Sequence, residues 1–240
     1  MDLIERTLPG AAQNIALDEA LLLEAEQRMD GRETLRLWEP TTPVVVVGRA
    51  SSVAQEVHLA ACRRDGVPVL RRSSGGSSIV TACGCLMYAV VLDYARRPQL
   101  RAIGRAHQFV LDRLAAALAP RAPGIECCGI SDLAVDGRKV SGNSLRCRRE
   151  WMLYHGTLLH GLPIELIEQY LRMPARQPDY RAARGHVQFV TNLSVTRDAL
   201  RAAVISAWEI DRERTDWPHG LTEQLVTEKY STADWNFKVP

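Results

Sequence analysis

The chain has 240 residues, a formal net charge of +2 and a charged fraction of 24%. This length suits one large domain with its own core, and we expect a single domain over residues 1–240. The near-neutral balance gives no reason to expect a nucleic-acid or membrane partner. The longest apolar run, residues 85–92, is too short to span a bilayer, and residues 1–10 do not have the pattern of a signal peptide. We therefore expect a cytoplasmic protein.

Lysine is rare in this chain. Of the 30 basic residues only three are lysines, at Lys139, Lys229 and Lys238, so a lysine inside a Gly/Ser-rich segment is notable. The six cysteines show no paired Cys-x-x-Cys spacing, which makes a zinc site or a disulfide framework a weak interpretation. We expect reduced thiols.

The first half of the chain mixes one helical pattern with several short apolar runs. Apolar residues at helical spacing predict an amphipathic helix over residues 14–26, with acidic residues on the face away from the core. Residues 35–38 and 44–47 predict two strands joined by a tight connection. A strand over residues 67–70 then leads into a polar glycine-bearing segment, and residues 86–92 resume strand character.

The second half continues this irregular alternation. We expect a helix over residues 106–118, strands on either side of a turn at Asp136-Gly137, a strand over residues 153–159 and a short helix over residues 163–171. Helices and strands do not alternate with the period of a doubly wound parallel fold. The pattern therefore predicts an α+β fold with a mixed sheet flanked by helices.

The segment RRSSGGSS, residues 71–78, follows directly after a predicted strand. Consecutive glycines allow the backbone to approach a ligand, and arginines supply planar donors for a carboxylate or a phosphate. A flexible hairpin loop with two solvated arginines would explain the same residues.

The segment DGRKVSGN places Lys139 in a predicted strand just before Ser-Gly. An ammonium group there can neutralise a phosphate and polarise a carbonyl. A solvated lysine in a hairpin is the alternative. His155, in YHGT, could orient a ligand or transfer a proton, although a lone strand histidine is more often a structural residue.

Five segments occur in an order that is more specific than any one of them: VVVVGR, RRSSGG, SDLAVDGRKVSGNSLR, YHGTLL and FVTNL. In this order they resemble the lipoate-protein ligase family, within the larger biotin/lipoate ligase group. The resemblance extends from about Asn14 to Phe237, where EKYSTADWNF resembles the end of the family's large catalytic domain. It implies a fold like that of class II aminoacyl-tRNA synthetases and biotin/lipoyl ligases, without the small C-terminal accessory domain of many ligases.

The resemblance also implies roles for individual residues. The family's RRxSGG loop holds the acyl chain and the adenylate phosphate, and this role falls here to Arg72, Ser74, Gly75 and Gly76. Lys139 matches the lysine that contacts both the acyl carbonyl and the phosphate, and is the implied catalytic residue. The other implied substrate-binding residues, around the lipoyl group and the adenylate, are Trp38, Asp132, Ser141, Gly142 and His155.

The implied reaction has two steps. ATP and lipoate give lipoyl-AMP and pyrophosphate, with Mg²⁺ on the phosphates, and a lysine of a lipoyl-carrier domain then accepts the lipoyl group. The sequence does not assign protein ligands to the metal. Some members obtain the accessory domain as a separate polypeptide, so a companion subunit is a further possible partner.

Departures from the family pattern leave two alternatives open. Where relatives continue with a third glycine and an HDxGN segment, this chain has Ser77, Thr81, Ala82 and Cys85. An octanoyl or lipoyl transferase would use a cysteine thioester and no ATP. Its candidate nucleophiles are Cys85, Cys127 and Cys128, although we interpret the last two as buried or incidental thiols. A degenerate module that binds a lipoyl group or a carrier domain is the second alternative.

Overall fold

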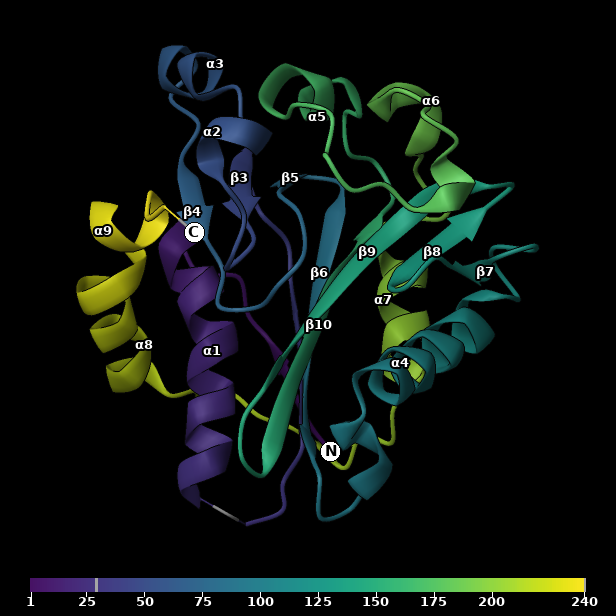
Figure 1. Cartoon of the computed structure of the whole chain (residues 1–240). Helices are drawn as coiled ribbons and strands as arrows, with labels where there is room; N and C mark the ends of the chain where they lie inside the picture. Colours follow the sequence, from purple (N-terminus) through teal and green to yellow (C-terminus); the bar gives the residue numbers. More distant parts are fainter. Residues whose placement is uncertain (29, 240) are drawn as a thin grey trace.

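A large mixed sheet and a small sheet form the body of the molecule (Figure 1). The computed structural model describes residues 1–28 and 30–239. The large sheet has the order β11-β1-β2-β6-β10-β9-β8-β7, in which β1 runs parallel to β2 and β11 and the other neighbours are antiparallel. Its strands are β1 (Asp2–Glu5), β2 (Thr34–Trp38), β6 (Cys85–Asp93), β7 (Glu126–Cys128), β8 (Asp132–Val135), β9 (Arg138–Cys147), β10 (Trp151–Leu159) and β11 (Arg212–Glu213).

The small sheet has the order β4-β3-β5 and lies at one end of the large sheet. Its strands are β3 (Val44–Val47), β4 (Val69–Arg71) and β5 (Ile79–Thr81). The strands expected at residues 35–38 and 44–47 are confirmed, but the short connection takes the chain from one sheet to the other. The strand expected at residues 67–70 is β4. It begins and ends slightly later than expected, so its last residue, Arg71, already belongs to the polar segment.

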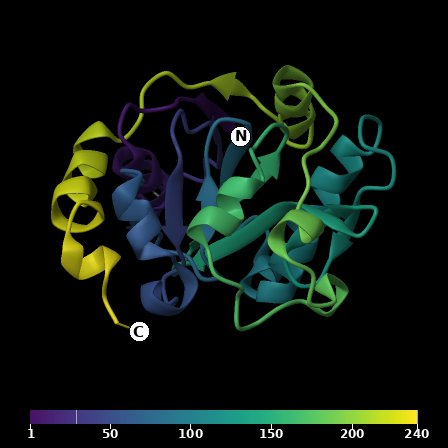
Figure 2. The same cartoon turned by 90° about the horizontal axis from the view of Figure 1, so that it is seen from above.

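Helices cover both faces of the large sheet. Seen from above, α8 and α9 lie outside α1 on one side, while α4 and α7 lie on the other (Figure 2). The helices are α1 (Ala11–Arg28), α2 (Val53–Glu56), α3 (Leu59–Arg64), α4 (Ile103–Leu118), α5 (Glu165–Tyr170), α6 (His186–Phe189), α7 (Arg197–Ser206), α8 (His219–Leu225) and α9 (Ala233–Asn236), with 3-10 turns η1 (Pro98–Arg101) and η2 (Asp179–Arg181) and a π-helical segment η3 (Val226–Tyr230).

Strand β6 shows why a continuous apolar run forms a central strand here. Leu86, Tyr88 and Val90 pack into the core shared with α4 and α7, whereas Ala89 and Val91 pack into the core beneath α1. A strand with both faces buried loses the polar alternation of a half-exposed strand. The mixed sheet flanked by helices, predicted from the sequence, is confirmed.

Two of the acidic residues of α1 are not on a solvent face, and for them the expectation was wrong. Asp18 and Glu19 are buried, because Arg36 of β2 pairs with Asp18 and Lys229 pairs with Glu19. Buried carboxylates require such partners. Within residues 1–28 and 30–239, no helix has both the length and the apolar character needed to cross a membrane.

Candidate active site

The RRSSGG loop is shaped by the guanidinium group of Arg72. This group is buried and donates hydrogen bonds to Ser74 Oγ (3.1 Å) and to the carbonyl oxygens of Val46 (3.2 Å), Gly75 (3.1 Å from Nε) and Ser77 (2.9 Å). Burial lowers the pKa of Arg72 to about 10, so it stays charged at neutral pH. Its donors are directed to the loop backbone, which makes Arg72 the frame of the loop in this structure.

Arg71 connects the start of the loop to the turn after β3 and to the C-terminal segment. Its guanidinium donates to the carbonyl oxygens of Gly48 (2.8 Å) and Ser51 (2.7 Å), and also to those of Trp235 (3.0 Å) and Lys238 (3.1 Å). The side chain is fully buried. Neither arginine is the solvated residue of a flexible loop.

Two glycines, Gly76 of the loop and Gly48 of the turn after β3, are required by the backbone, whereas a side chain on Gly75 would meet no neighbouring atom. Gly76 has a φ of +83°, in the left-handed region. A Cβ atom on Gly48 would lie 1.7 Å from the Gly76 carbonyl oxygen, so Gly48 cannot carry a side chain there. The turn after β3 and the RRSSGG loop are therefore packed backbone against backbone.

Lys139 lies on β9, where its ammonium group reaches across the neighbouring strand. Lys139 Nζ is 2.7 Å from Asp132 Oδ1, and the Tyr180 hydroxyl donates to Asp132 Oδ2 (2.8 Å). A Cβ atom on Gly142 would lie 2.9 Å from Lys139 Nζ, so this glycine leaves the path open for the lysine. Burial and the Asp132 charge raise the pKa of Tyr180, which keeps its hydroxyl protonated as a donor.

Ser141 and Asn143 fix the strand that carries Lys139. The fully buried Ser141 hydroxyl accepts a hydrogen bond from Asn143 Nδ2 (3.0 Å), which also donates to the Ser131 carbonyl oxygen (2.8 Å). The Tyr88 hydroxyl donates to Asn143 Oδ1 (2.5 Å). These contacts give Ser141 a structural position behind the site.

His155 lies on β10 and connects the loop to α1. Its Nε2 is 2.6 Å from Ser74 Oγ, and its Nδ1 is 3.3 Å from Asp18 Oδ2. Asp18 in turn accepts a hydrogen bond from Arg36 (2.5 Å), whose side chain is fully buried. Contacts with the RRSSGG loop and with α1 thus hold the imidazole ring of His155 in one orientation.

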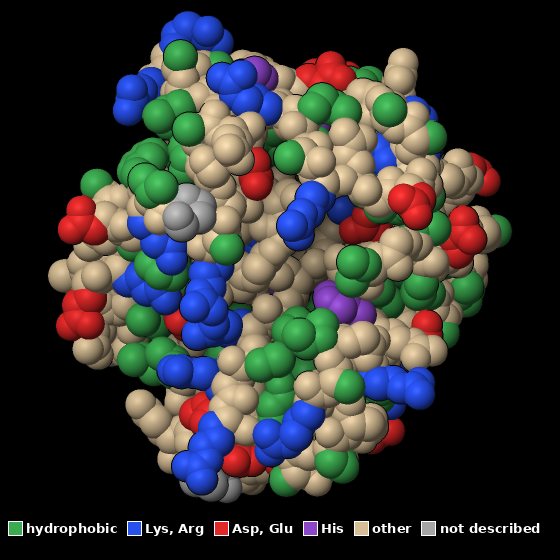
Figure 3. Space-filling model, viewed as in Figure 1, with side chains coloured by type: hydrophobic (Ala, Val, Ile, Leu, Met, Phe, Trp, Pro, Cys, Tyr) green, Lys and Arg blue, Asp and Glu red, His purple; other side chains and the backbone are tan. Residues whose placement is uncertain are grey.

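The structure brings the loop and Lys139's strand side by side. Ser144 of β9 donates to the Gly75 carbonyl oxygen (2.8 Å), and Ser144 also pairs with His155 across β9 and β10. The space-filling view of this face shows a hollow at its centre, with Lys and Arg side chains gathered on its left (Figure 3). Of the predicted site residues, Ser74, Gly75 and His155 meet here, beside the strand that carries Lys139.

Trp38 lies farther along the same network. It lines a small solvent-open cavity together with Ile15, Val46 and Thr81, a lining that does not include Lys139 or Ser74. The Arg36 guanidinium carbon is 5.1 Å from the centre of the Trp38 ring, and this links the cavity to Asp18. The indole N–H of Trp38 is buried and lacks a hydrogen-bond partner among the described residues.

The candidate thiols have surroundings that disfavour the thiolate. Cys85 is buried, and burial raises its pKa. Cys127 is exposed, so of the two interpretations given for it, buried or incidental, burial was wrong; desolvation and the nearby Asp112 raise its pKa to about 11. Cys128 pairs with Asp132 across β7 and β8, and desolvation and Glu126 raise its pKa.

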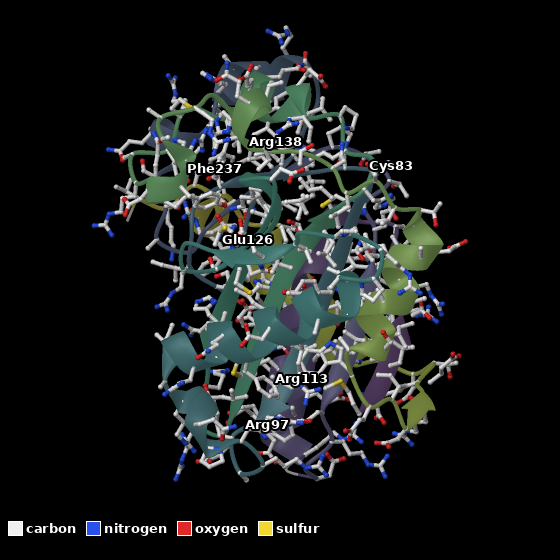
Figure 4. The ribbon with its side chains drawn as sticks, turned by 90° about the vertical axis from the view of Figure 1, so that its right-hand side faces the viewer. Cys83, Arg97, Arg113, Glu126, Arg138 and Phe237 are labelled. Carbon is white, nitrogen blue, oxygen red and sulfur yellow. The ribbon has the colours of Figure 1, made fainter. Side chains whose placement is uncertain are left out.

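Cys83 and the start of β7 lie apart in the structure (Figure 4). Cys83, in the turn after β5, lies at one edge of the molecule, away from Glu126, which marks the start of β7. Cys83 is exposed. The thiols of β7 are therefore the ones closest to the Asp132 side of the site.

The motifs identified Lys139 and His155 but not their partners Asp18, Arg36, Tyr180, Asn143 and Ser144. Asp18 and Arg36 carried a weak signal, since each is a charged residue inside an apolar run. Tyr180 comes from the η2 turn, 48 positions beyond its partner Asp132, and no local pattern marks it.

Comparison with known proteins places this chain in a family. Octanoyltransferase LipM of Brevibacillus brevis is 24% identical over 95% of this chain and 95% of its own length. A probable lipoate-protein ligase A of Mycoplasma pneumoniae is 25% identical over 93% of this chain and 67% of its own length.

A solved structure with the same fold is the bipartite lipoate protein ligase of Thermoplasma acidophilum, described with its E2 lipoyl domain. It matches with a TM-score of 0.83 and 21% identity, over 100% of this chain and 96% of that one. The family model of the lipoyl protein ligase A/B catalytic domain matches residues 10–208. The chain therefore belongs to the lipoyl protein ligase A/B catalytic domain family.

Proposed function

We propose that the chain is an ATP-dependent lipoate-protein ligase, which forms lipoyl-AMP and passes the lipoyl group to a lysine of a carrier domain. The observation that carries this proposal is the position of Lys139. Its ammonium group lies over Gly142, is anchored by Asp132 and stands on the strand that adjoins the RRSSGG loop. A half-exposed cation next to a closely packed glycine loop suits a phosphate joined to an acyl group.

In the first step a carboxylate oxygen of lipoate attacks the α-phosphorus of ATP, and pyrophosphate leaves. In the second step the carrier lysine's amine attacks the acyl carbon, the bond to the phosphate oxygen breaks and AMP leaves, while the amine loses a proton. One ammonium N–H of Lys139 is directed at Asp132, which leaves the others for the phosphate and the carbonyl oxygen. Both steps gather negative charge on oxygens that one ammonium can reach.

His155 would act by positioning. Both ring nitrogens are engaged, one with Ser74 and one with Asp18, so the ring fixes the loop against α1. We assign Arg72, Gly75 and Gly76 to the same task of holding the loop backbone in place for the adenylate. In the part of the chain that the structure describes, no group of three Asp, Glu, His or Cys side chains could hold a metal ion. The Mg²⁺ in this proposal would therefore enter on the phosphates of ATP.

An octanoyltransferase is the second candidate, and the LipM relatives favour it. Cys128 is the thiol nearest to Asp132, through the β7–β8 pairing. Attack on a thioester needs a thiolate, and the desolvation and Glu126 that raise the pKa of Cys128 oppose one. This is why we place the ligase first.

Lipoate-dependent exchange of labelled pyrophosphate into ATP tests the first step. We expect exchange by the wild-type protein and its loss in Lys139→Ala. If exchange does not occur, even with added companion proteins, the ligase proposal fails.

The transferase is tested by mixing the protein with octanoyl-acyl carrier protein and an apo carrier domain, then measuring intact mass. We expect no octanoyl group on the wild-type enzyme. We also expect the Cys127→Ser/Cys128→Ser variant to lipoylate the carrier from ATP and lipoate as well as the wild type does. An octanoyl adduct that disappears in this variant, together with ATP-independent transfer, would establish the second candidate instead.

A further inference from the structure

Four basic side chains from three separate segments gather beside the site. Arg49 follows β3, Arg146 and Arg148 lie at the end of β9 and just beyond it, and Lys238 follows α9. We call these four residues the basic rim. On the face drawn in Figure 3, Lys and Arg side chains gather on the left of the hollow.

The rim is attached to the RRSSGG loop. The backbone N–H of Arg49 donates to the Ser74 carbonyl oxygen (2.8 Å), and the Lys238 carbonyl oxygen accepts from Arg71 (3.1 Å). Lys238 Nζ is 4.2 Å from the centre of the Trp235 ring, which holds the side chain on the surface by a cation–π contact. Two of the four rim residues, Arg49 and Lys238, are therefore fixed in position relative to the loop.

The rim's charges lack acidic partners. Arg149 and Lys229, which are close by, form ion pairs with Glu150 and Glu19, but among the residues that the structure describes none forms an ion pair with the four rim side chains. Arg49 and Arg148 are exposed, and Arg146 and Lys238 are half-buried.

The rim residues also repel one another. Burial is the largest cause that lowers the pKa of Arg146, and the charge of Arg49 is the second. The pKa of Lys238 is likewise lowered first by burial and then by the charges of Arg71 and Arg49. Glu19, which is paired with Lys229, acts on the pKa of Arg146 in the opposite direction. Like charges held together without ion-pair partners of their own disfavour the isolated state and attract an acidic surface. The chain as a whole is only +2, so this is a local feature.

We propose that the basic rim is the docking surface for an acidic face of the carrier domain that delivers the acceptor lysine. The inference rests on the proposed function, because an acceptor lysine must reach Lys139 and its carrier must then cover the surface around the hollow. A face built from three segments is broad enough to meet a protein surface, and charged rims chiefly set the encounter rate and the orientation of a partner.

The test compares Arg148→Glu/Lys238→Glu with a control that changes charge equally on the opposite side. Arg105→Glu/Arg121→Glu is that control: both residues are exposed, Arg105 lies in α4 and Arg121 just beyond its end, and α4 lies across the molecule from α8 and α9 (Figure 1). Binding of an apo lipoyl-carrier domain of net negative charge is measured by calorimetry at low and high salt. We expect wild-type binding to weaken with salt, the rim variant to bind about tenfold more weakly, and the control to change less than about twofold.

Pyrophosphate exchange with free lipoate is measured on the same proteins, without any carrier. We expect the rim variant to match the wild type within about twofold. A parallel loss of exchange would assign the rim to nucleotide phosphates and overturn the inference, as would unchanged carrier binding. If the wild type shows no exchange but the rim variant still loses carrier binding, the docking inference stands and the ligase proposal fails.

Discussion

The RRSSGG loop and the β8–β9 hairpin both carry cations, yet they hold them in opposite ways. Arg71 and Arg72 are buried and direct their donors at backbone carbonyls, whereas Lys139 is 27% exposed and has one ion pair. The difference teaches that a motif's basic residues need not all meet the ligand. The arginines build the shape of the site, and the lysine is left free for chemistry.

The contrast follows from the side chains themselves. A guanidinium group has five donors in a fixed plane, which suits it to bridging several carbonyls at once. An ammonium group is compact and can turn between Asp132 and a bound phosphate. Three predictions test whether the arginines have a structural role and Lys139 a chemical one.

The largest effect should come from Arg72→Met, which keeps an unbranched apolar stem but removes the guanidinium group and its donors. The buried carbonyl oxygen of Val46 would lose its partner, and so would the carbonyl oxygens of the exposed loop residues Gly75 and Ser77. We expect the free energy of unfolding to fall by about 3–5 kcal/mol, as measured by urea denaturation. Arg121→Met, at an exposed position, should change it by less than about 0.5 kcal/mol. A loss under about 1 kcal/mol in Arg72→Met would show that Arg72 is not the frame of the loop.

Lys139→Ala should have the reverse profile, with little change in stability and a large loss of activity. Removing a charge that stabilises the transition state typically costs about 3 kcal/mol, or roughly a hundredfold in rate. Transfer of lipoate to an apo carrier domain in the presence of ATP, followed by intact mass, measures the rate. Lys139→Arg retains the charge and tests whether a compact cation is needed. A loss of less than about fivefold in Lys139→Ala would remove the lysine from the chemistry.

The smallest consequence for stability and for the proposed reaction concerns Cys127, on the strand next to the hairpin. Because its pKa is raised to about 11, the folded protein should hold roughly a hundredfold less thiolate at pH 8 than an ordinary thiol. Alkylation by iodoacetamide, read at this cysteine by peptide mass, should be slow in the folded protein and should accelerate as the pH rises toward about 11. The same protein unfolded in urea is the control. Equal alkylation rates for both states at pH 8 would mean that Asp112 and burial do not protect this thiol.

Much of the fold could be predicted because its signals are local. The run at residues 86–92 and the Asp136-Gly137 turn predicted β6 and the β8–β9 hairpin, and local patterns placed Lys139 and His155 each on a strand. That these two strands are neighbours was found only in the structure. The partners could not be predicted. Asp18 is a polar residue in an amphipathic helix, and only Arg36, arriving from another element, makes its burial favourable.

The same limit applies to substrate roles. Arg72 occupies the position that the family resemblance gives to a substrate contact, but the geometry that directs its donors to Val46 and Ser77 depends on how β3 and β4 pack. A motif specifies which residue stands at a position. It does not specify which of its atoms remain free after folding.

The contacts of Arg71 also bear on the order of events during synthesis. This arginine bonds to Trp235 and Lys238, which are 164 and 167 positions further along the chain. At about 5–20 residues per second, a ribosome reaches them roughly 10–30 s after it has made the loop. During that interval the nascent loop lacks the hydrogen bonds from Arg71 to Trp235 and Lys238. The site can therefore take its final shape only after the segment around Trp235 has emerged, which keeps incomplete chains from binding substrate in the finished geometry.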